Sequence, residues 1–340
     1  MTIQSKIKPI CVSIIIPALN EKNYINHCLE SIVNLHSMNL DKEIIVVDNG
    51  SCDNTVEICK SYGAKVLLKK GGTIASLRNY GAKKSRGDLL AFLDADCVAS
   101  ENWLEKAFTY LNGVGQVILG FRLSIPENCN WVAKCWDLLF AKRYFTAEVD
   151  WIPSGNMIMT RKAFMSINGF DEKLESNEDY DFCARMRRQG YKIISSSDIS
   201  ITHLRPPQTL IQIFRKELWH GKEVLKVFIN DIYRSKDIYI FKRKNFKVVL
   251  YAFCYLMFIL FLLLSFIIAI STKTFLPLFV ALLFPLILSF LLAFNKTRLI
   301  KKYNLILGLT ILFAIYGFSR AISLLPYNKI KKWMPNLLHR

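Results

Sequence analysis

The chain has 340 residues, a formal net charge of +18 and 52% hydrophobic residues. It is too apolar and too basic for an ordinary soluble globular protein. Its nine cysteines are scattered and odd in number, without a CxxC pair, which indicates reduced cytosolic thiols rather than a disulfide framework or a cysteine metal site.

The first hundred residues alternate between two kinds of pattern. Short β-branched runs bounded by polar residues predict strands, and apolar residues spaced three and four apart predict helices. The expected strands are residues 11–17, 43–48, 65–68 and 89–94, and the expected helices are residues 24–32, 53–62 and 74–84. This alternation implies an α/β fold with a parallel sheet covered by helices, and with ligands at the carboxyl ends of the strands.

The region from about residue 116 to residue 200 is less regular, and its clearest element is a helix near residues 178–189. Residues 210–229 then form a basic amphipathic pattern. Its apolar positions are 210, 213, 214, 218, 225 and 228, and its basic residues are Arg215, Lys216, Lys222 and Lys226. A helix of this kind just before a membrane segment is expected to lie in the interface and attract anionic head groups. The alternative is a helix that packs on the soluble domain.

Three long apolar segments follow, at residues 248–270, 275–294 and 303–325. Each approaches the roughly 20 residues that a helix needs to cross a membrane. Helices buried in a soluble core are the alternative, but these segments leave no polar face to meet water. The N-terminal stretch MTIQSKIKPI lacks an apolar signal region, so we expect about the first 245 residues to stay on the side of synthesis.

Basic residues near the membrane set the expected orientation. Lys242, Arg243, Lys244 and Lys247 precede the first segment, and Lys296, Arg298, Lys301 and Lys302 lie between the second and the third. Both stretches are expected to be cytoplasmic. Three crossings would put the C-terminus outside, although Lys329, Lys331, Lys332 and Arg340 are basic and Arg320 interrupts the third segment. The third segment therefore either crosses the membrane or is re-entrant or interfacial.

Polar residues follow three of the expected strands, at Asn20-Glu21, at Asp48-Asn49-Gly50 and at Asp94-Ala95-Asp96. The carboxyl ends of parallel strands meet at one rim of a sheet. Two carboxylates separated by one residue can both turn toward a hard cation, which takes the rest of its ligands from water and from a diphosphate. Mg²⁺ or Mn²⁺ fits best, although solvated aspartates in a turn produce the same pattern.

Four blocks of the chain, taken together, resemble the inverting GT-A glycosyltransferases of family 2. They are VSIIIPALNE (12–21), IIVVDNGSCDNT (44–55), SLRNYGAKKSRGDLLAFLDADC (76–97) and SGNMIMTRKAFMSINGFDEKLESNEDYDFCARMRRQGYKI (154–193). The resemblance implies a GT-A fold, a Rossmann-like mixed sheet, over residues 1–205. An interfacial helix and basic linker (206–246), a membrane domain with two or three transmembrane helices (247–326) and a basic tail (327–340) are expected to follow.

The resemblance also implies a nucleotide-sugar site. The residues expected to line the nucleotide pocket are Pro17, Ala18, Asn20 and Glu21, with Asp48 accepting hydrogen bonds from the base or the ribose. Alternatively, Glu21 has no role in binding and its negative charge only favours the N-terminus of the following helix. Likewise, Asp48 could serve only as a turn-forming residue. Many relatives carry a second aspartate where this chain has Asn49, a departure expected to alter one contact and not the activity.

Arg78 matches an arginine that lies near the diphosphate in the family, or else it pairs structurally with Asp48 or Asp94. Asp94 and Asp96 would face a metal ion that carries the diphosphate, with Asp96 the more direct ligand. His203 could complete the shell of the metal or of the diphosphate, or only satisfy backbone groups.

Gly155 and Asn156 match the stretch that contacts the donor sugar, near Trp151, although Trp151 and Trp103 suit a core equally well. Inversion needs a base that takes the proton of the acceptor hydroxyl. The resemblance places this base in Glu178-Asp179, and we favour Asp179 with Glu178 second. Acidic residues favoured by the dipole of a helix N-terminus are the alternative.

The expected activity is therefore the transfer of a sugar from a UDP- or GDP-sugar donor to a lipid-linked acceptor at the cytoplasmic face of a membrane, in bacteria the inner one. The acceptor would be a polyprenyl phosphate or a polyprenyl-diphosphate oligosaccharide, as in cell envelope polysaccharide biosynthesis. A catalytically silent binding partner and a processive polysaccharide synthase remain alternatives. The synthase is disfavoured because its QxxRW motif is interrupted: Lys216 follows Arg215.

Two further classes fit the sequence poorly. A dinucleotide-dependent dehydrogenase needs glycines in its first strand-to-helix turn, and residues 17–23 contain none. Nucleic-acid binding could be inferred from the positive charge, but much of this charge lies beside the apolar segments. We therefore expect no nucleic-acid partner.

Overall fold

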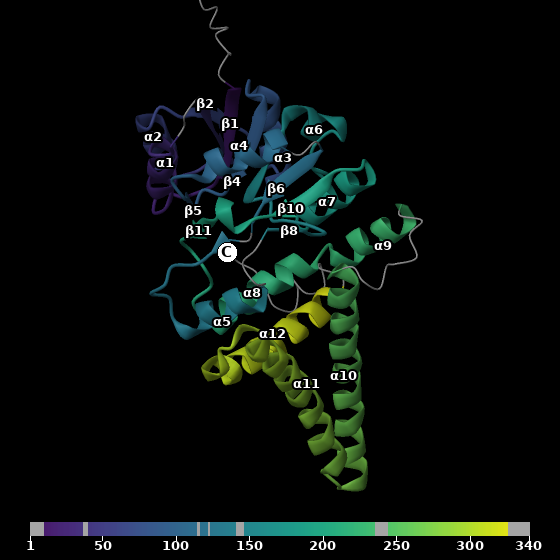
Figure 1. The fold of residues 1–340 in the computed structure, drawn as a ribbon. Coiled ribbons are helices and arrows are strands. Elements are labelled where there is room, and N and C mark those ends of the chain that lie inside the picture. Colours follow the sequence, from purple (N-terminus) through teal and green to yellow (C-terminus); the bar gives the residue numbers. More distant parts are fainter. Residues whose placement is uncertain are drawn as a thin grey trace, which may run out of the picture. The chain divides into compact units, whose positions relative to one another are not determined.

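A computed structural model describes residues 10–36, 40–113, 116–121, 123–140, 146–234 and 244–325 (Figure 1). The chain divides into two compact units, the first made of residues 1–126 and 144–205 and the second of residues 127–143 and 206–340. The predicted domain boundaries stay a prediction; the structure groups residues 127–143, expected in the first domain, with the second unit. The predicted C-terminal tail and the basic residues Lys242 and Arg243 lie outside the described residues.

The first unit is built on a sheet of eight strands in the order β3-β2-β1-β4-β9-β6-β10-β8. These strands are β1 (Ile10–Ala18), β2 (Leu40–Asp48), β3 (Lys65–Leu68), β4 (Leu89–Leu93), β6 (Val117–Gly120), β8 (Ala147–Glu148), β9 (Asn156–Thr160) and β10 (Lys192–Ser195). A smaller sheet has the order β5-β11-β7. It is formed by β5 (Cys97–Ala99), β7 (Leu123–Ser124) and β11 (Ile201–His203).

The large sheet is mixed. Strands β3, β2, β1 and β4 are parallel to one another, so the carboxyl ends of β1, β2 and β4 share one rim as predicted. Strand β9 runs antiparallel to both β4 and β6, and β8 is antiparallel to β10. Strand β1 lies between two other strands and is buried from Val12 to Ala18, which explains its almost continuous apolar sequence.

Helices cover both faces of this sheet. They are α1 (Ile25–Val33), α2 (Thr55–Ser61), α3 (Ile74–Lys84), α4 (Trp103–Gly113), α6 (Arg161–Ser166) and α7 (Glu178–Arg188). One apolar cluster joins Ile14 and Ile16 of β1 to α1 and α4. The other joins Ile15 to α3, α6 and α7. Alternate residues of β1 thus face opposite layers, as the two-residue period of a strand requires.

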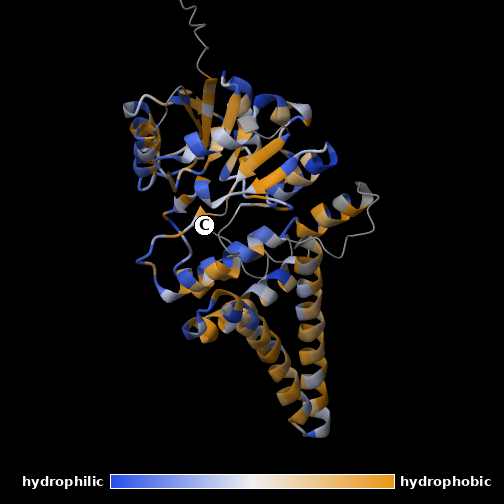
Figure 2. Cartoon of the chain, in the orientation of Figure 1, coloured by the Kyte–Doolittle hydropathy of each residue, from blue (hydrophilic) through white to orange (hydrophobic). Residues whose placement is uncertain are grey.

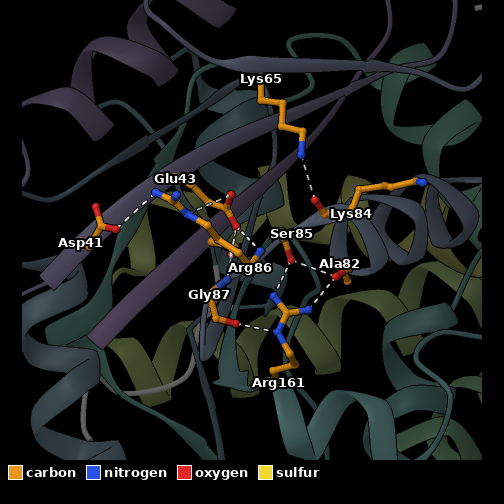
Figure 3. A network of polar contacts seen from close by, with 10 residues as sticks. Asp41, Glu43, Lys65, Ala82, Lys84, Ser85, Arg86, Gly87 and Arg161 are labelled. Atoms are coloured by element: carbon orange, nitrogen blue, oxygen red, sulfur yellow. Dashed lines mark hydrogen bonds and ion pairs between the residues drawn. The ribbon is translucent and has the colours of Figure 1, made fainter. Parts of the chain in front are cut away.

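A polar network ties the connection between α3 and β4 to the sheet edge where β1 and β2 begin, opposite the rim (Figure 3). The Arg161 guanidinium donates to the carbonyl oxygens of Gly87 and Ala82, at 2.6 and 2.8 Å. The Glu43 carboxylate accepts from the Ser13 hydroxyl and from the Gly87 N–H. This network holds the start of β4 in place. It therefore also determines the position of Asp94, which follows the other end of the strand.

The second unit is helical. Its helices are α5 (Trp131–Phe140), α8 (Leu210–Gly221), α9 (Val224–Arg234), α10 (Lys244–Thr272), α11 (Leu276–Ile300) and α12 (Ile306–Ser323). The amphipathic pattern predicted one helix over residues 210–229, and the structure divides it at residues 222–223. The break follows Gly221, whose low helix propensity makes it a suitable end.

Three helices of this unit are long and apolar enough to cross a membrane, at Val248–Thr272, Leu276–Ile300 and Tyr303–Ser323. Figure 2 shows α10 and α11 as apolar along most of their length. Many of their large apolar side chains are exposed, among them Leu263 and Phe279. Such surfaces suit contact with lipid rather than water.

Helix α12 contacts both of the longer helices. The Tyr251 hydroxyl of α10 donates to the Phe313 carbonyl at 2.9 Å, and the ring of Tyr255 packs on Phe318. Leu309 clusters with Ala293 of α11. These positions lie in the first half of α10 and the second half of α11, so α12 lies across one end of this helix pair (Figure 1). That arrangement favours the interfacial alternative for the third segment.

Helix α8 packs against α12 and α5. Ile213 is fully buried in one apolar cluster with residues of both helices. Gly221 allows close approach, because a Cβ atom there would lie 2.0 Å from the Ser323 hydroxyl oxygen. Part of the apolar face that was expected to meet the membrane is thus covered by protein.

Candidate active site

The loops that follow β1 and β2 are bonded to each other. The Asn20 side-chain oxygen accepts from the Cys52 N–H at 2.9 Å, and the Asn20 N–H donates to the Ser51 hydroxyl at 2.9 Å. The Glu21 N–H donates to the Thr55 hydroxyl at 2.8 Å. Asn20 has a φ of 56°, a left-handed conformation that asparagine tolerates better than most residues. Pro17 and Ala18 are buried in the end of β1 itself.

Asp48 forms the turn after β2. Its carboxylate accepts from the N–H groups of Gly50 and Ser51, at 2.9 and 3.0 Å, and its side chain is almost completely buried. Within the chain, the Asp48 carboxylate therefore acts as a turn former, which was the alternative interpretation of this residue. Asn49 also has a structural partner, because its amide exchanges two hydrogen bonds with the backbone of Gly72.

Arg78 joins three elements at the rim. It projects from α3 and is 1% exposed. One of its terminal nitrogens lies 2.6 Å from the Asp94 carboxylate, and the other lies 2.9 Å from the Glu178 carboxylate. The Ser154 hydroxyl donates to the same oxygen of Glu178 at 2.9 Å. Of the two structural partners considered for Arg78, the structure provides Asp94 and not Asp48, and it adds Glu178.

Gly155 lies directly against Asp94. A Cβ atom on Gly155 would be 2.2 Å from a carboxylate oxygen of Asp94, which only glycine avoids. Asn156 is fully buried: it accepts from the Trp103 indole N–H at 2.9 Å and donates to the Ile199 carbonyl at 2.8 Å. Asn156 could therefore reach a donor sugar only by giving up these bonds, so its predicted sugar contact remains a prediction.

Asp96 lies beside His203 and Arg205. The Leu204 N–H donates to the Asp96 carbonyl at 2.8 Å, which brings the end of β11 next to the aspartate. The Nε2 atom of His203 is 3.4 Å from a carboxylate oxygen of Asp96. Arg205 lies 3.2 Å from the same oxygen and 2.8 Å from the Glu21 carboxylate, so its guanidinium bridges two acidic side chains.

Arg205 was not among the predicted site residues. Its only sequence signal is its place two residues after His203, in the loop that leaves the last strand. Its partner Glu21 is 184 positions away, which no local pattern reveals. Burial raises the pKa of Glu21, and the neighbouring Asp96 adds to this effect, although the Arg205 charge opposes it.

The carboxylates of the rim can be tested for a fit to Mg²⁺ or Mn²⁺. Such an ion holds ligands at about 2.1 Å in an octahedron, so ligands about 3 Å apart suit it, and it usually keeps several waters and substrate phosphates. Asp96 and His203 meet this spacing. The buried Glu21 oxygen Oε2 has no hydrogen-bond partner in the structure. The described residues include no group of three or more metal-binding side chains, so the remaining ligands would have to come from water and substrate.

Asp179 lies in the first turn of α7, where the chain also carries Glu178 and Asp181. Glu178 pairs with Arg78, and Asp181 pairs with Arg185 at 2.7 Å. Asp179 is half-buried, and its carboxylate accepts from the Tyr180 N–H at 2.7 Å. The helix-dipole alternative applies to all three carboxylates, so the choice of Asp179 as base remains a prediction.

Residues 13–174 match the family model described as Glycosyl transferase family 2. The chain carries a family 2 glycosyltransferase domain. The matched stretch of this domain contains the rim residues Asp48, Asp94 and Asp96, and it ends just before Glu178. The predicted family and the predicted class of enzyme, a glycosyltransferase, are confirmed.

Relatives with similar sequences or structures are also glycosyltransferases by name. Glycosyltransferase AglE of Haloferax volcanii is 27% identical over 236 residues, which are 65% of this chain and 75% of the relative. The structure of the mannosyltransferase PcManGT from Pyrobaculum calidifontis, in complex with GDP-Man and Mn²⁺, has a TM-score of 0.58 and 15% identity, and it covers 92% of this chain and 86% of its own. This likeness confirms the GT-A-like mixed α/β fold with its C-terminal apolar helices.

A crystal structure of S. aureus TarS has a TM-score of 0.48 and 21% identity, and the match covers 64% of this chain. The chain spans 40% of the length of that protein.

Proposed function

We propose that this glycosyltransferase moves a single sugar from a nucleotide-diphosphate donor to a lipid-linked acceptor at the cytoplasmic surface of a membrane. The observation that carries the proposal is the Arg78 bridge. One buried guanidinium holds Asp94, the first residue of the proposed metal-binding motif, and Glu178, beside the proposed base, in one site. Donor-binding and acceptor-activating carboxylates would thus be positioned by a single residue.

On the donor side, Asp96 and His203 would hold a divalent cation together with the diphosphate, and Asp94 would support them. When bound, the cation would neutralise the charge that develops on the departing nucleoside diphosphate. The loops at Asn20 and Asp48 are fixed by hydrogen bonds and would form the walls for the nucleotide. GDP-Man in the PcManGT structure supports a nucleotide-sugar donor of this class.

On the acceptor side, Asp179 would take the proton of the acceptor hydroxyl or phosphate. Glu178 is less suited to this role, because its carboxylate oxygen Oε1 is already held by Arg78 and by the Ser154 hydroxyl. A lipid-linked acceptor is supported by the three apolar helices and by the basic residues that flank them.

The test uses the purified full-length protein with Mn²⁺ or Mg²⁺. A thermal-shift screen of nucleoside diphosphates identifies the base, since a bound ligand raises the melting temperature. Release of nucleoside diphosphate is then measured with the matching nucleotide sugars and with polyprenyl phosphate or polyprenyl-diphosphate acceptors. Asp96→Ala and Asp179→Asn are each expected to abolish release.

Asp41→Asn is the matched control, because Asp41 lies on the same strand as Asp48 but at its opposite end, and it is exposed. Its activity should equal that of the unmodified protein. Full turnover in Asp96→Ala would refute the metal assignment. Nucleotide binding without transfer to any acceptor would favour the silent binding partner, and a ladder of products in mass spectra would favour a processive synthase.

A further inference from the structure

The second unit contains a pocket that the proposed function has not used. Its volume is about 460 Å³, and eight residues from α9, from the turn before it and from the end of α12 line it. They are Lys222, Leu225, Lys226, Ile229 and Asn230 on one side and Ser323, Leu324 and Leu325 on the other. The volume lies within the range of about 300–1,000 Å³ that small-molecule sites occupy.

The polar lining of the pocket suits an anion. Lys222 lies in the turn between α8 and α9, Lys226 lies in the first turn of α9, and both line the pocket. Among the residues that the structure describes, no acidic side chain lines the pocket. Glu223 pairs with Lys226 at 3.1 Å from outside the lining, and because Lys226 is about half exposed this pair is weak. Asn230 adds an amide group that can donate hydrogen bonds to phosphate oxygens.

The rest of the lining suits a hydrocarbon chain. Leu225, Ile229, Leu324 and Leu325 are apolar, and the Ile229 side chain is 44% exposed. The pocket is therefore neither an anion site alone nor an apolar groove alone. A ligand that satisfies both parts of the lining has a phosphate joined to an apolar chain.

The pocket lies where apolar helices end. Ser323 is the last residue of α12, and Leu324 and Leu325 follow it. The ring of Phe228 in α9 is 6.2 Å from that of Phe246 in the first turns of α10, which ties α9 to the beginning of the first apolar helix. Where a membrane-spanning helix ends, it reaches the layer of lipid head groups, and basic residues there attract anionic head groups.

We propose that this pocket binds the lipid acceptor, with Lys222 and Lys226 at the phosphate of a polyprenyl phosphate and the four apolar residues along the first isoprene units. The proposal rests on the proposed function for the identity of the lipid. The binding itself needs no donor, so it can be measured without sugar transfer.

The experiment measures binding of radiolabelled farnesyl phosphate to the full-length protein in detergent. The double variant Lys222→Gln/Lys226→Gln is expected to bind at least about tenfold more weakly, a loss of about 1.4 kcal/mol. The matched control, Lys301→Gln/Lys302→Gln, removes the same charge from exposed positions of the same unit and should bind normally. Lys222→Arg/Lys226→Arg keeps the charge and should retain binding. Melting temperatures show that each variant is folded.

Competitors distinguish the source of the phosphate. Farnesol should compete poorly, because it lacks the anion, and phosphatidylglycerol should compete less well than farnesyl phosphate. Equal competition by phosphatidylglycerol would make this a general lipid site and overturn the proposal, as would unchanged binding in the glutamine variant. If the binding pattern holds but no sugar reaches any lipid, the proposed function fails and the pocket stands. If transfer occurs and the glutamine variant has an unchanged KM for the lipid, the pocket assignment fails alone.

Discussion

Arg320 of α12 forms an ion pair with Glu217 of α8, with 2.6 Å between nitrogen and oxygen, and both side chains are almost completely buried. The charge that interrupts the third apolar segment is therefore compensated inside the protein. Glu217 is likewise explained, because it is a carboxylate on the buried side of a helix that is otherwise rich in basic residues. The pair fastens α8 to α12 near the close contact of Gly221 with Ser323.

Removal of one partner should destabilise the second unit strongly. Glu217→Ala leaves the Arg320 charge buried without compensation, which typically costs about 3–5 kcal/mol. The apolar double variant Glu217→Leu/Arg320→Met should recover most of the loss, since buried ion pairs are often no better than apolar contacts. Melting temperatures in detergent measure both, with Glu223→Ala, at a more exposed pair, as the control that changes little. A double variant as unstable as the single one would contradict this account.

Gly155→Ala should impair catalysis more than folding. The added methyl group would occupy the place of the Asp94 carboxylate and displace it from Arg78. A displacement of about 1 Å in a catalytic group can lower the rate about 100-fold. The control is Gly63→Ala, which meets no atom within 4 Å but has a φ of +73°, so it should lower the melting temperature without lowering turnover. Normal activity of Gly155→Ala would show that Asp94 need not stay in place.

Arg205 is expected to compete with a divalent cation for Asp96. In the absence of nucleotide, Arg205→Ala should therefore bind Mn²⁺ up to about fivefold more tightly than the unmodified protein, since the pair is partly exposed and worth about 0.2–1 kcal/mol. Electron paramagnetic resonance titration of free Mn²⁺ measures this directly. Weaker Mn²⁺ binding in Arg205→Ala would mean that the arginine orients Asp96 for the cation.

Glu21 and Glu43 should affect stability with opposite dependence on pH. Burial raises the pKa of Glu21, so its favourable contribution is present at low pH and is lost as the pH rises through the folded-state pKa. Burial opposes ionisation of Glu43 too, but hydrogen bonds from Ser13, Arg86 and Gly87 lower its pKa on balance. Its contribution is therefore present above the usual glutamate pKa of about 4.3 and is lost as the pH falls.

Comparison of Glu21→Gln and Glu43→Gln with the unmodified protein tests whether the two stability contributions depend on pH in opposite directions. Between about pH 3 and pH 7, the melting temperature of the unmodified protein relative to Glu21→Gln should decrease with rising pH. Relative to Glu43→Gln it should increase over the lower part of the same range. Parallel trends in the two comparisons would contradict the assignment.

The C-terminal tail is expected on the same side of the membrane as the glycosyltransferase domain, because α12 lies across one end of α10 and α11. A cysteine added after Arg340 should then react with a membrane-impermeant maleimide only when inverted vesicles or lysed cells are used. A cysteine placed at Lys273, between α10 and α11, should show the opposite pattern. Labelling of the C-terminal cysteine in intact cells would instead indicate that the third segment crosses.

The parts of the fold that depend on local sequence could be predicted. Strand β3 and helix α3 begin and end where their patterns indicate, since the apolar period and the bounding polar residues are read within a few positions. The half of the sheet beyond β4 could not be predicted from local patterns, because β9 is placed by antiparallel pairing with β4, more than 60 residues earlier in the chain. Alternation of strands and helices indicates parallel order and carries no signal for an inserted antiparallel strand.

The same limit applies to the site. The rim carboxylates were predicted because each follows a strand that is itself evident. The partners of these carboxylates were only partly predicted, since Arg78 meets Glu178 across 100 positions and Arg205 meets Glu21 across 184. Charge compensation between distant segments depends on the tertiary fold, and a single sequence gives the charges without their pairing.

The pair between Glu217 and Arg320 bears on how the catalytic half can be prepared in isolation. A fragment that stops before the apolar segments but retains α8 would leave Glu217 without the opposite charge of Arg320. It would also expose to water the apolar face of α8 that α12 covers in the full-length protein. Such a fragment should aggregate. A water-soluble version has to stop at residue 205 and replace residues 127–143, which belong with the helices, by a short polar bridge.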